Sequence, residues 1–487
     1  MKISGSRTVN YNSGRLKTKF TQISNISNTT DVKSLFCNHI KDEQINMKNI
    51  LLFGAGKSAT SLIDYLVSNA PRQKWHITVA DQDLALIKSK TGKSYYVTPA
   101  VIDIRDQTSR QKLVQETDLV ISLLPPALHI FVARDCLQFS KNLLTASYID
   151  PEIRQLEKEI EEKGLLFMYE MGLDPGIDHM SAMKLIHSIE KKGGQISAFR
   201  SYCGGLISPE SNDNPWQYKI SWNARNVVLA GSSGAVFREK GKVKEIAYQQ
   251  LFDQPKTIHI PSLGKLAYYP NRDSMGYMDA YKLEEIPTFM RATLRYPDFC
   301  EGWSTLVKLG LTEDTKKIPT NAMTYYDWAS QKIEQDPKLS NEENIASYLG
   351  ISAKSKVLRQ LKFLGLLNGE TIGLGEQTNA SILQHVVESK LSMEPADKDM
   401  IVMTHEIEFE RRGMTTRLHS YMITQGEDSM RTAMAKTVGL PLGIMAKLLL
   451  QDKISLKGLK IPIMPDVYNP VLKELEDYNI RFEESFE

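Results

Sequence analysis

The chain has 487 residues and a nearly neutral charge, with 60 Lys and Arg against 58 Asp and Glu. This length allows two or three domains with a sizeable core, and the charge balance gives no reason to expect nucleic acid as a partner. No apolar run approaches the roughly 18 residues that cross a bilayer, and the 4 cysteines lie far apart without paired spacing, so we expect no membrane partner, no metal site and a reducing, cytoplasmic compartment.

Residues 1–46 are predicted to form a disordered basic tail. They are rich in Ser, Asn and Thr and contain no acidic side chain up to Thr30, so they cannot bury a core. The segment resembles an organellar transit sequence but lacks a clear amphipathic helix with arginines. An equal alternative is that the true start is Met47, because many dinucleotide-binding chains begin with such a strand-like run.

A glycine turn joins an apolar run at residues 49–53 to a helical pattern. In a dinucleotide site the first glycine permits the turn, the second lets the backbone approach the pyrophosphate, and a third small residue allows close packing. Gly54, Gly56 and Ala59 take these places. We discount a P-loop, because it requires a glycine where Leu51 stands.

The next predicted strand, residues 76–80, ends at Asp81, where a carboxylate can accept the ribose hydroxyls of NAD. NADP carries a phosphate at this point and requires Arg or Lys, whereas Asp81-Gln82-Asp83 would repel it. We therefore expect NAD as the preferred cofactor and NADP as the alternative. Without such a role, Asp81 fits an ordinary surface turn.

Strand-like runs at residues 96–104, 119–124 and 142–148 alternate with helical stretches. This alternation predicts a parallel sheet that carries its ligand at the carboxyl ends of the strands. We assign residues 47–170 to a Rossmann dinucleotide-binding domain with an α/β fold.

Residues 169–180 form the densest candidate site, with the sequence Tyr-Glu-Met-Gly-Leu-Asp-Pro-Gly-Ile-Asp-His-Met. Pro175 suits the first turn of a helix, and Asp174 just before it can cap the free backbone donors there. The positive end of that helix would face a ligand beside Asp174. The alternative is an ordinary capped helix after a strand.

The pattern changes after residue 170. A strand is predicted at residues 196–203, and a hairpin joins residues 399–409 to 415–424 around Arg412-Gly413. The chain closes with a predicted helix at residues 471–475 and a short strand at 479–482. We assign the substrate domain to two parts, residues 171–303 and 395–430, with a small helical insert over 304–394 and a C-terminal segment over 431–487.

Six strings carry a resemblance: Gly-Leu-Asp-Pro-Gly-Ile-Asp-His at 172–179, Ser-Tyr-Cys-Gly-Gly-Leu at 201–206, Asp-Asn-Pro at 213–215, Lys-Ile-Ser-Trp at 219–222, Tyr-Pro-Asn-Arg-Asp-Ser at 269–274 and Thr-Leu-Arg-Tyr at 293–296. Several of them are too long for chance matching. In these strings the chain resembles the saccharopine dehydrogenases of the glutamate-forming type, also called saccharopine reductases. The likeness runs from about residue 47 to the end.

The resemblance implies a Rossmann domain, an α/β substrate domain with a mixed sheet, a small helical insert, and a C-terminal segment that returns to the first domain. It also implies an enzyme of lysine metabolism that interconverts saccharopine with L-glutamate and 2-aminoadipate 6-semialdehyde by hydride transfer to or from a nicotinamide cofactor. We expect these small molecules as partners and leave a homodimer open.

The site residues follow from the same resemblance. The cofactor contacts would be Gly54, Ala55, Gly56, Lys57, Ser58, Asp103, Ile104, Leu124, Ala146, Ser147, Leu173, Pro175 and Asn223, to which the residue types add Asp81 and Gln82. The substrate contacts would be Ser147, Tyr148, Asp174, Arg272, Thr293, Leu294 and Arg295. Arginines suit a substrate with three carboxylates because a guanidinium donates two parallel hydrogen bonds to each, although either arginine could instead form a surface ion pair. Family members that use NADP carry an arginine where Gln82 stands, which agrees with the expectation of NAD.

Proton transfer in this reaction requires titratable groups near the nicotinamide. The candidate catalytic residues are Asp174, Tyr148 and Cys203, of which Asp174 is the best. Cys203 could instead be a small buried residue, and His179 fits a core histidine without a catalytic role.

Two other functions are weighed against this one. A carboxynorspermidine synthase-like reductase would bind a substrate with fewer carboxylates, which does not suit Arg272 and Arg295. A non-catalytic Rossmann redox sensor would have no need of Asp174 together with both arginines.

Overall fold

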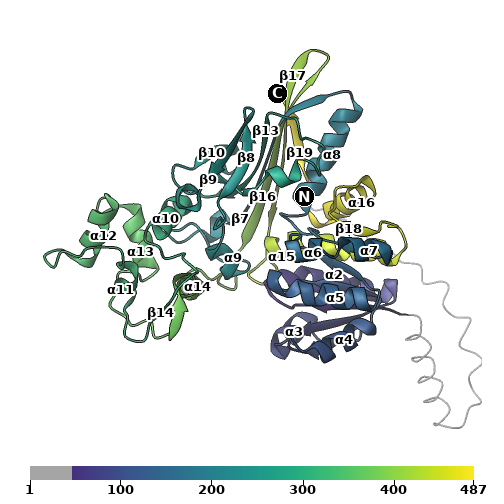
Figure 1. Ribbon diagram of the computed structural model, residues 1–487, viewed down its shortest axis with the longest axis horizontal. Coiled ribbons are helices and arrows are strands. Elements are labelled where there is room, and N and C mark those ends of the chain that lie inside the picture. The colour runs from purple at the N-terminus through teal and green to yellow at the C-terminus, as the bar shows by residue number, and fades with distance from the viewer. Residues whose placement is uncertain (1–46) are drawn as a thin grey trace, which may run out of the picture. The chain divides into compact units, whose positions relative to one another are not determined.

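The computed structural model describes residues 47–487, so the prediction of a disordered tail over residues 1–46 lies outside the described residues. Two large sheets organise the described part (Figure 1). The first is parallel throughout and has seven strands in the order β18-β6-β5-β4-β1-β2-β3. The strands are β1 (Lys48–Phe53), β2 (Trp75–Asp81), β3 (Val97–Val101), β4 (Leu119–Ser122), β5 (Asn142–Thr145), β6 (Leu166–Met168) and β18 (Gly458–Lys460).

Helices cover both faces of this sheet, because its central strands are apolar on both sides. Alternate residues of β1 point to opposite faces: Ile50 and Leu52 pack in one hydrophobic cluster, and Leu51 and Phe53 pack in another. The connecting elements are η1 (Lys57–Ala59), α2 (Thr60–Gln73), α3 (Leu84–Thr91), α4 (Gln107–Gln115), η2 (Pro126–Leu128), α5 (His129–Gln138), α6 (Pro151–Arg154) and α7 (Glu157–Glu162). This arrangement confirms the predicted Rossmann fold.

The second sheet has ten strands and mixes parallel with antiparallel pairs, as the resemblance implied. Its main path runs in the order β10-β11-β13-β7-β16-β17-β19. The predicted hairpin is present, since β16 and β17 pair antiparallel up to Arg411 and Met414. The strands are β7 (Gln195–Ile207), β8 (Ala235–Glu239), β9 (Lys242–Ile246), β10 (Lys256–Ile260), β11 (Gly264–Pro270), β12 (Arg272–Asp273), β13 (Thr288–Arg295), β16 (Asp399–Arg411), β17 (Met414–Gln425) and β19 (Glu483–Phe486).

A mostly helical segment with its own hydrophobic cluster separates β13 from β16. The rings of Phe299 and Trp303 stack with centroids 5.0 Å apart in this cluster. The elements here are α10 (Pro297–Lys308), β14 (Lys317–Pro319), α11 (Tyr325–Ala329), α12 (Asn341–Leu349), α13 (Lys356–Phe363), β15 (Glu376–Thr378) and α14 (Asn379–Lys390). Shorter elements precede it: η3 (Pro209–Ser211), α9 (Ala224–Val228), η4 (Tyr248–Gln250) and η5 (Met275–Tyr277).

The C-terminal segment contains α15 (Ala433–Leu450), α16 (Pro465–Leu475) and η6 (Glu476–Tyr478), and its strand β18 extends the Rossmann sheet beside β6. The predicted closing elements were therefore misplaced. The helix begins at Pro465 rather than residue 471. The strand begins at Glu483 rather than residue 479, because Asn479 adopts a left-handed conformation that ends η6.

Sequence analysis missed α15, which is apolar on most sides. Close contact with α2 depends on two glycines, since a Cβ at Gly439 would lie 2.7 Å from the Leu62 nitrogen and one at Gly443 would lie 2.5 Å from the Tyr65 ring. Among the described helices, α15 is long and apolar enough to cross a membrane by length and composition, contrary to the expectation that no such run exists. Most of it is buried inside the protein, as in a core helix.

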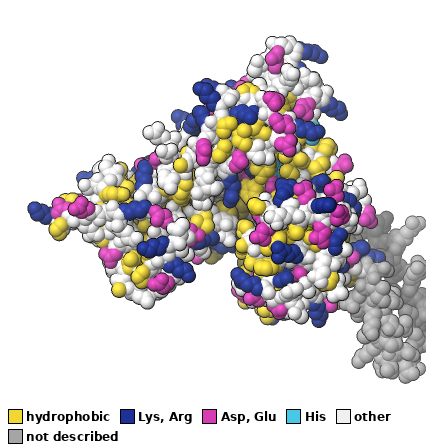
Figure 2. All heavy atoms as spheres, in the orientation of Figure 1, with side chains coloured by type: hydrophobic (Ala, Val, Ile, Leu, Met, Phe, Trp, Pro, Cys, Tyr) yellow, Lys and Arg dark blue, Asp and Glu magenta, His cyan; other side chains and the backbone are white. Residues whose placement is uncertain are grey.

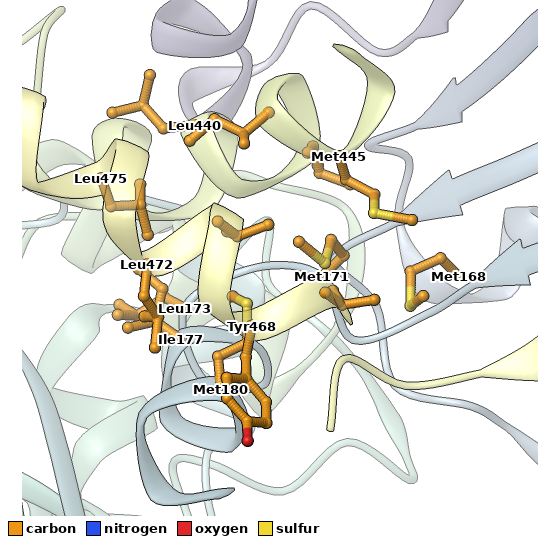
Figure 3. Packing of buried hydrophobic residues seen from close by; sticks show 14 of the residues in the cluster. Met168, Met171, Leu173, Ile177, Met180, Leu440, Met445, Tyr468, Leu472 and Leu475 are labelled. Atoms are coloured by element: carbon orange, nitrogen blue, oxygen red, sulfur yellow. The ribbon is translucent and has the colours of Figure 1, made fainter. Parts of the chain in front are cut away.

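The segment that precedes α8 (Ile177–Lys191) is anchored by this C-terminal packing. Figure 3 shows side chains of β6, α15 and α16 gathered around the residues that lead into α8. Leu173 and Ile177 are buried on either side of Asp174 and Pro175. The backbone that carries Asp174 is thus fixed by hydrophobic contacts from elements distant in the sequence.

Candidate active site

A cleft of about 780 Å³ lies at the carboxyl ends of β1, β2, β4 and β5. Its other walls come from β7, β11 and β13 of the mixed sheet and from α9, α14 and α15. Figure 2 shows this face of the protein hollowed between the elements around α9 and α14 and those around α2 and α5. The cleft therefore joins the ligand-binding edge of a Rossmann sheet to a second wall of polar side chains.

The glycine turn between β1 and η1 forms one end of the cleft. Gly54 has φ +97°, and a Cβ there would lie 2.8 Å from the Leu123 carbonyl oxygen, so only glycine fits. A Cβ at Gly56 would meet nothing within 4 Å, which leaves space above the turn. No side chain caps η1 or α2. The backbone N–H groups of Lys57 and Ser58 have no acceptor among the described residues and are thus available to a phosphate, so the turn fits a dinucleotide.

Asp81 lies beside this turn but is occupied by the backbone. Its carboxylate accepts hydrogen bonds from Ala55 N at 2.7 Å and from Asp83 N at 3.1 Å. Lys90 donates to the Gly56 carbonyl oxygen, and Arg105 lines the same cleft. Burial lowers the pKa of the Lys90 ammonium to about 8, and Asp81 partly opposes this. Asp81 therefore shapes the turn, and the Lys90 ammonium lies near it.

Asp174 does not cap a helix, so that prediction was wrong. The helix α8 begins at Ile177 after Gly176, and Asp178 accepts the Gly176 N–H at 2.6 Å. The Asp174 carboxylate instead accepts a hydrogen bond from Arg291 Nη2 at 2.6 Å and one from the Tyr148 hydroxyl at 3.4 Å. The charged Arg291 side chain on β13 is a stronger hydrogen-bond donor than the backbone N–H groups that a helix cap would bind. Bound to Arg291, the Asp174 carboxylate borders the cleft.

The three candidate proton carriers differ in their electrostatics. Burial raises the pKa of the Asp174 carboxyl; Arg291 opposes this and Asp178 adds to it. Burial also raises the pKa of the Tyr148 hydroxyl and of the Cys203 thiol above their usual alkaline values. Tyr148 and Cys203 are thus neutral near pH 7, and Asp174 is the group whose proton affinity moves toward that range.

Strand β13 presents alternate residues to the cleft. Thr293 and Arg295 line it, whereas Leu294 points to the opposite face and is fully buried. The Arg295 side chain is 4% exposed and lies between the rings of Tyr218 and Phe299, 5.5 and 5.3 Å from their centroids.

Arg295 is a buried cation without an acidic partner. Its Nη1 donates to the Leu294 carbonyl oxygen at 2.8 Å, its Nε has no hydrogen-bond partner, and no described carboxylate forms an ion pair with it. Arg272 is exposed at the cleft, lies 5.1 Å from the Tyr148 ring centroid, and likewise pairs with no acid in residues 47–487. A buried unpaired guanidinium is costly unless an anion binds it, so this wall suits a ligand with carboxylates.

The structure brings almost all predicted site residues to this one cleft; the exceptions are Ala55 and Leu294, which are buried beside it. Their individual roles stay predictions. Those that line the cleft are Gly54, Gly56, Lys57, Ser58, Asp81, Gln82, Asp103, Ile104, Leu124, Ala146, Ser147, Tyr148, Leu173, Asp174, Pro175, Cys203, Asn223, Arg272, Thr293 and Arg295.

Sequence analysis missed several residues of this site. The cleft is also lined by Arg105, Ser122, His129 and Glu388. Arg291, which does not line the cleft, donates a hydrogen bond to Asp174. The spacing of Arg291, Thr293 and Arg295 was the available signal for Arg291, since alternate residues of a strand share one face.

Ser122 and His129 form a buried pair at the end of β4, with Ser122 Oγ 2.9 Å from His129 Nδ1. Burial lowers the pKa of His129 from 6.5 to about 4, so the unfolded chain binds the proton more strongly between these values. We expect the free energy of unfolding to fall as pH drops from 6.5 to about 4. His129→Gln should remove up to about 1.4 kcal/mol per pH unit of this slope in urea titrations. The exposed His259→Gln is the control; an unchanged slope in His129→Gln would contradict the assignment.

The sequence was compared with known proteins. Residues 50–168 match the saccharopine dehydrogenase NADP binding domain, and residues 172–480 match the saccharopine dehydrogenase C-terminal domain. A saccharopine dehydrogenase [NADP(+), L-glutamate-forming] from Saccharomyces cerevisiae is 33% identical over 90% of this chain and 99% of its own length.

Two further similarities extend this result. The alpha-aminoadipic semialdehyde synthase of Arabidopsis thaliana is 33% identical over 92% of this chain, which spans about half (46%) of that relative. The solved structure of apo saccharopine dehydrogenase (L-Glu forming) from Saccharomyces cerevisiae superposes with a TM-score of 0.80, at 32% identity over 90% of this chain and 100% of that one.

The expectation that NAD is the preferred cofactor was wrong. The matching domain is an NADP binding domain, and the glutamate-forming relatives are named for NADP(+). The expectation assumed that the Asp81 carboxylate is free to meet the ribose and to repel a phosphate. It is instead engaged by Ala55 N and Asp83 N, and the Lys90 ammonium lies near it.

Proposed function

The chain belongs to the saccharopine dehydrogenase family, and we propose that its cleft interconverts saccharopine with L-glutamate and 2-aminoadipate 6-semialdehyde, as an NADP-dependent oxidoreductase of lysine metabolism that acts on a CH–NH bond. The observation that carries this proposal is the buried Arg295, which faces the cleft without an acidic partner among the described residues. Saccharopine supplies three carboxylates to such a wall.

The reaction breaks a C–H bond at the side-chain carbon of the lysine part of saccharopine that carries the nitrogen. Saccharopine joins that carbon to the α-nitrogen of glutamate through a secondary amine. Loss of a hydride from carbon and of a proton from nitrogen gives an imine, and water then splits the imine into L-glutamate and the semialdehyde. NADP supplies the hydride acceptor when it is bound.

The residues of the glycine turn are suited to hold the pyrophosphate of the cofactor, because the backbone N–H groups of Lys57 and Ser58 have no acceptor among the described residues. The carboxyl ends of β4 and β5 continue from this turn toward Asp174. The cofactor and substrate regions therefore meet beside Tyr148 and Asp174.

Asp174 is the residue that we assign to proton transfer. The secondary amine of saccharopine must lose its proton before hydride departs, and the later attack of water also requires a base. Asp174 borders the cleft, and burial raises the pKa of its carboxyl although Arg291 opposes this. Tyr148 stays protonated, so its hydroxyl can donate a hydrogen bond to the carboxylate or to the reacting nitrogen.

Arg272 is assigned to a substrate carboxylate at the outer part of the cleft. Arg272→Ala should lower kcat/KM for saccharopine by about 10- to 100-fold, since a charge-assisted hydrogen bond contributes roughly 1.5 to 3 kcal/mol. The loss should fall mainly on KM, as is typical of a contact equally strong in ground and transition states. Steady-state kinetics test this.

The matched control for Arg272 is Arg359→Ala, which removes an exposed arginine of α13 outside the cleft. It should leave kcat/KM unchanged, and the affinity for NADP should hardly change in either variant. Normal saccharopine kinetics in Arg272→Ala would place this residue outside the substrate site.

The proposed function is tested by comparing saccharopine with carboxynorspermidine as substrates for NADP reduction. We expect a far higher kcat/KM for saccharopine, because carboxynorspermidine would leave Arg272 or Arg295 without a carboxylate. Preference for carboxynorspermidine would establish the alternative reductase. Binding of NADP without turnover of either substrate would favour the redox sensor.

The compartment and assembly belong to the proposal as well. Cys136, Cys203 and Cys300 are free and buried, which supports a reducing compartment such as the cytoplasm. A homodimer stays a prediction.

A further inference from the structure

One guanidinium bridges two carboxylates behind the cleft. Arg291 Nη2 donates to Asp174 Oδ1 at 2.6 Å and to Asp178 Oδ2 at 2.7 Å. The Arg291 side chain lies over the Tyr277 ring, 4.4 Å from its centroid, and the residue is 2% exposed. Three charges from β13, α8 and the segment before α8 therefore meet at the wall of the cleft, where Arg291 and Asp178 are buried and Asp174 borders the cleft.

The two carboxylates are not equivalent. Asp178 also accepts the Gly176 N–H at 2.6 Å, lies 3.8 Å from His179 Nδ1, and does not line the cleft. Asp174 lines the cleft, and its other hydrogen bond, from the Tyr148 hydroxyl, is long at 3.4 Å. The inner carboxylate is thus fully engaged, while the outer one keeps capacity for a ligand.

We propose that Arg291 and Asp178 are positioning residues that hold the Asp174 carboxylate at the cleft and set its proton affinity. This rests on the proposed function, in which Asp174 exchanges a proton with the secondary amine of saccharopine. In that step the N–H bond of the substrate breaks and an O–H bond forms on Asp174, and NADP, when bound, would then accept the hydride.

The electrostatics of the surrounding groups agree with this division. Burial favours the protonated form of both carboxyls. At Asp178 the effects of His179 and Arg291 together are larger than that of burial, so the pKa of this carboxyl is lowered. At Asp174 the effect of burial is the largest, and the pKa is raised. The other titratable groups that face this pair are Tyr148, His179, Cys203, Tyr277, Tyr281 and, from β16, His405. In many active sites two neighbouring acids have different environments, so that one exchanges protons in the reaction and the other stays ionised.

Hydrogen bonds of His179, the residue after Asp178, anchor the start of α8 further inside the protein. His179 Nε2 lies 2.8 Å from Glu170 Oε2, and its Nδ1 lies 2.6 Å from the Tyr281 hydroxyl. Tyr277 donates to the same Glu170 oxygen at 3.0 Å. These bonds fix α8 and the aromatic face under Arg291, so the guanidinium has one geometry from which to reach both carboxylates.

Two substitutions are expected to shift the pH profile of kcat/KM for saccharopine in opposite directions. Asp178→Asn removes a negative charge and leaves Arg291 to Asp174 alone, so the acid limb should move to lower pH by about one unit. Arg291→Gln removes the positive charge, so the acid limb should move to higher pH by a similar amount. Arg291→Lys keeps the charge and should restore the limb toward its original position.

A merely structural role would lower the melting temperature of these variants and leave the acid limb in place, which would overturn the proposal. Shifts of both variants in the same direction would overturn it too. If Arg291→Gln does not fold, Asp178→Asn alone decides, because asparagine keeps the shape of the side chain.

A second measurement separates this proposal from the proposed function. The Asp174 carboxyl is titrated by carbon-13 NMR of protein labelled at aspartate, with its resonance assigned by its loss in Asp174→Asn. A lower midpoint in Asp178→Asn supports the positioning role even if the wild-type protein does not oxidise saccharopine. An unchanged midpoint overturns it even if saccharopine is oxidised.

Discussion

Replacing Asp174 by asparagine is expected to lower kcat for saccharopine oxidation by roughly 100- to 10,000-fold, the usual contribution of a positioned acid or base. Asparagine keeps the shape of the side chain and an oxygen for the Arg291 hydrogen bond, but it cannot accept the proton of the substrate nitrogen. The loss should fall on kcat more than on KM, since the proton is transferred in the reaction step. Stopped-flow measurement of NADPH formation tests this directly.

Cys203→Ala is the matched control for this variant. The Cys203 thiol lines the same cleft, but burial raises its pKa well above the usual value, so it is a poor base near pH 7. We expect a much smaller loss of kcat in Cys203→Ala, with Tyr148→Phe between the two. A fall in Cys203→Ala as large as that in Asp174→Asn would contradict the assignment of Asp174.

Arg295→Met is the second substitution with a large expected effect. Truncating one partner of a buried charge pair costs about 2 to 5 kcal/mol, so kcat/KM for saccharopine should fall by roughly 30- to several thousand-fold. The reason is that a substrate carboxylate would enter an apolar site between Tyr218 and Phe299 without its charged partner. Arg295→Lys keeps the charge but loses the paired donors, and should lose less.

Stability distinguishes this role of Arg295 from a structural one. Because no described carboxylate pairs with Arg295, methionine removes an uncompensated buried charge, and the melting temperature should stay the same or rise. A strong loss of thermal stability in Arg295→Met, with normal saccharopine kinetics in the protein that remains folded, would show that the arginine supports the fold.

Features that depend on neighbouring residues were predictable from the sequence. The apolar run before Gly54 and the φ of that glycine are local, and they specify the turn wherever the strand lies. The parallel sheet and the hairpin at Arg412-Gly413 follow from short patterns of the same kind. The resemblance then identified most of the residues that share the cleft.

Features that depend on distant partners were not predictable in this way. The local sequence predicts Asp174 as a helix cap, but in the structure it binds Arg291, which is 117 positions away in the chain. The local sequence predicts Asp81 as a free carboxylate, but in the structure it accepts a hydrogen bond from Ala55 N, which is 26 positions away in the chain. Leu294 looks like a contact residue within its string, but strand alternation turns it to the core.

The central claim is tested most directly by quantifying the products formed from saccharopine and NADP by the purified full-length protein. We predict that one L-glutamate appears for each NADPH formed, and that both products are lost together in Asp174→Asn. Absence of L-glutamate from the wild-type reaction, or NADPH formation that does not depend on saccharopine, would contradict the account.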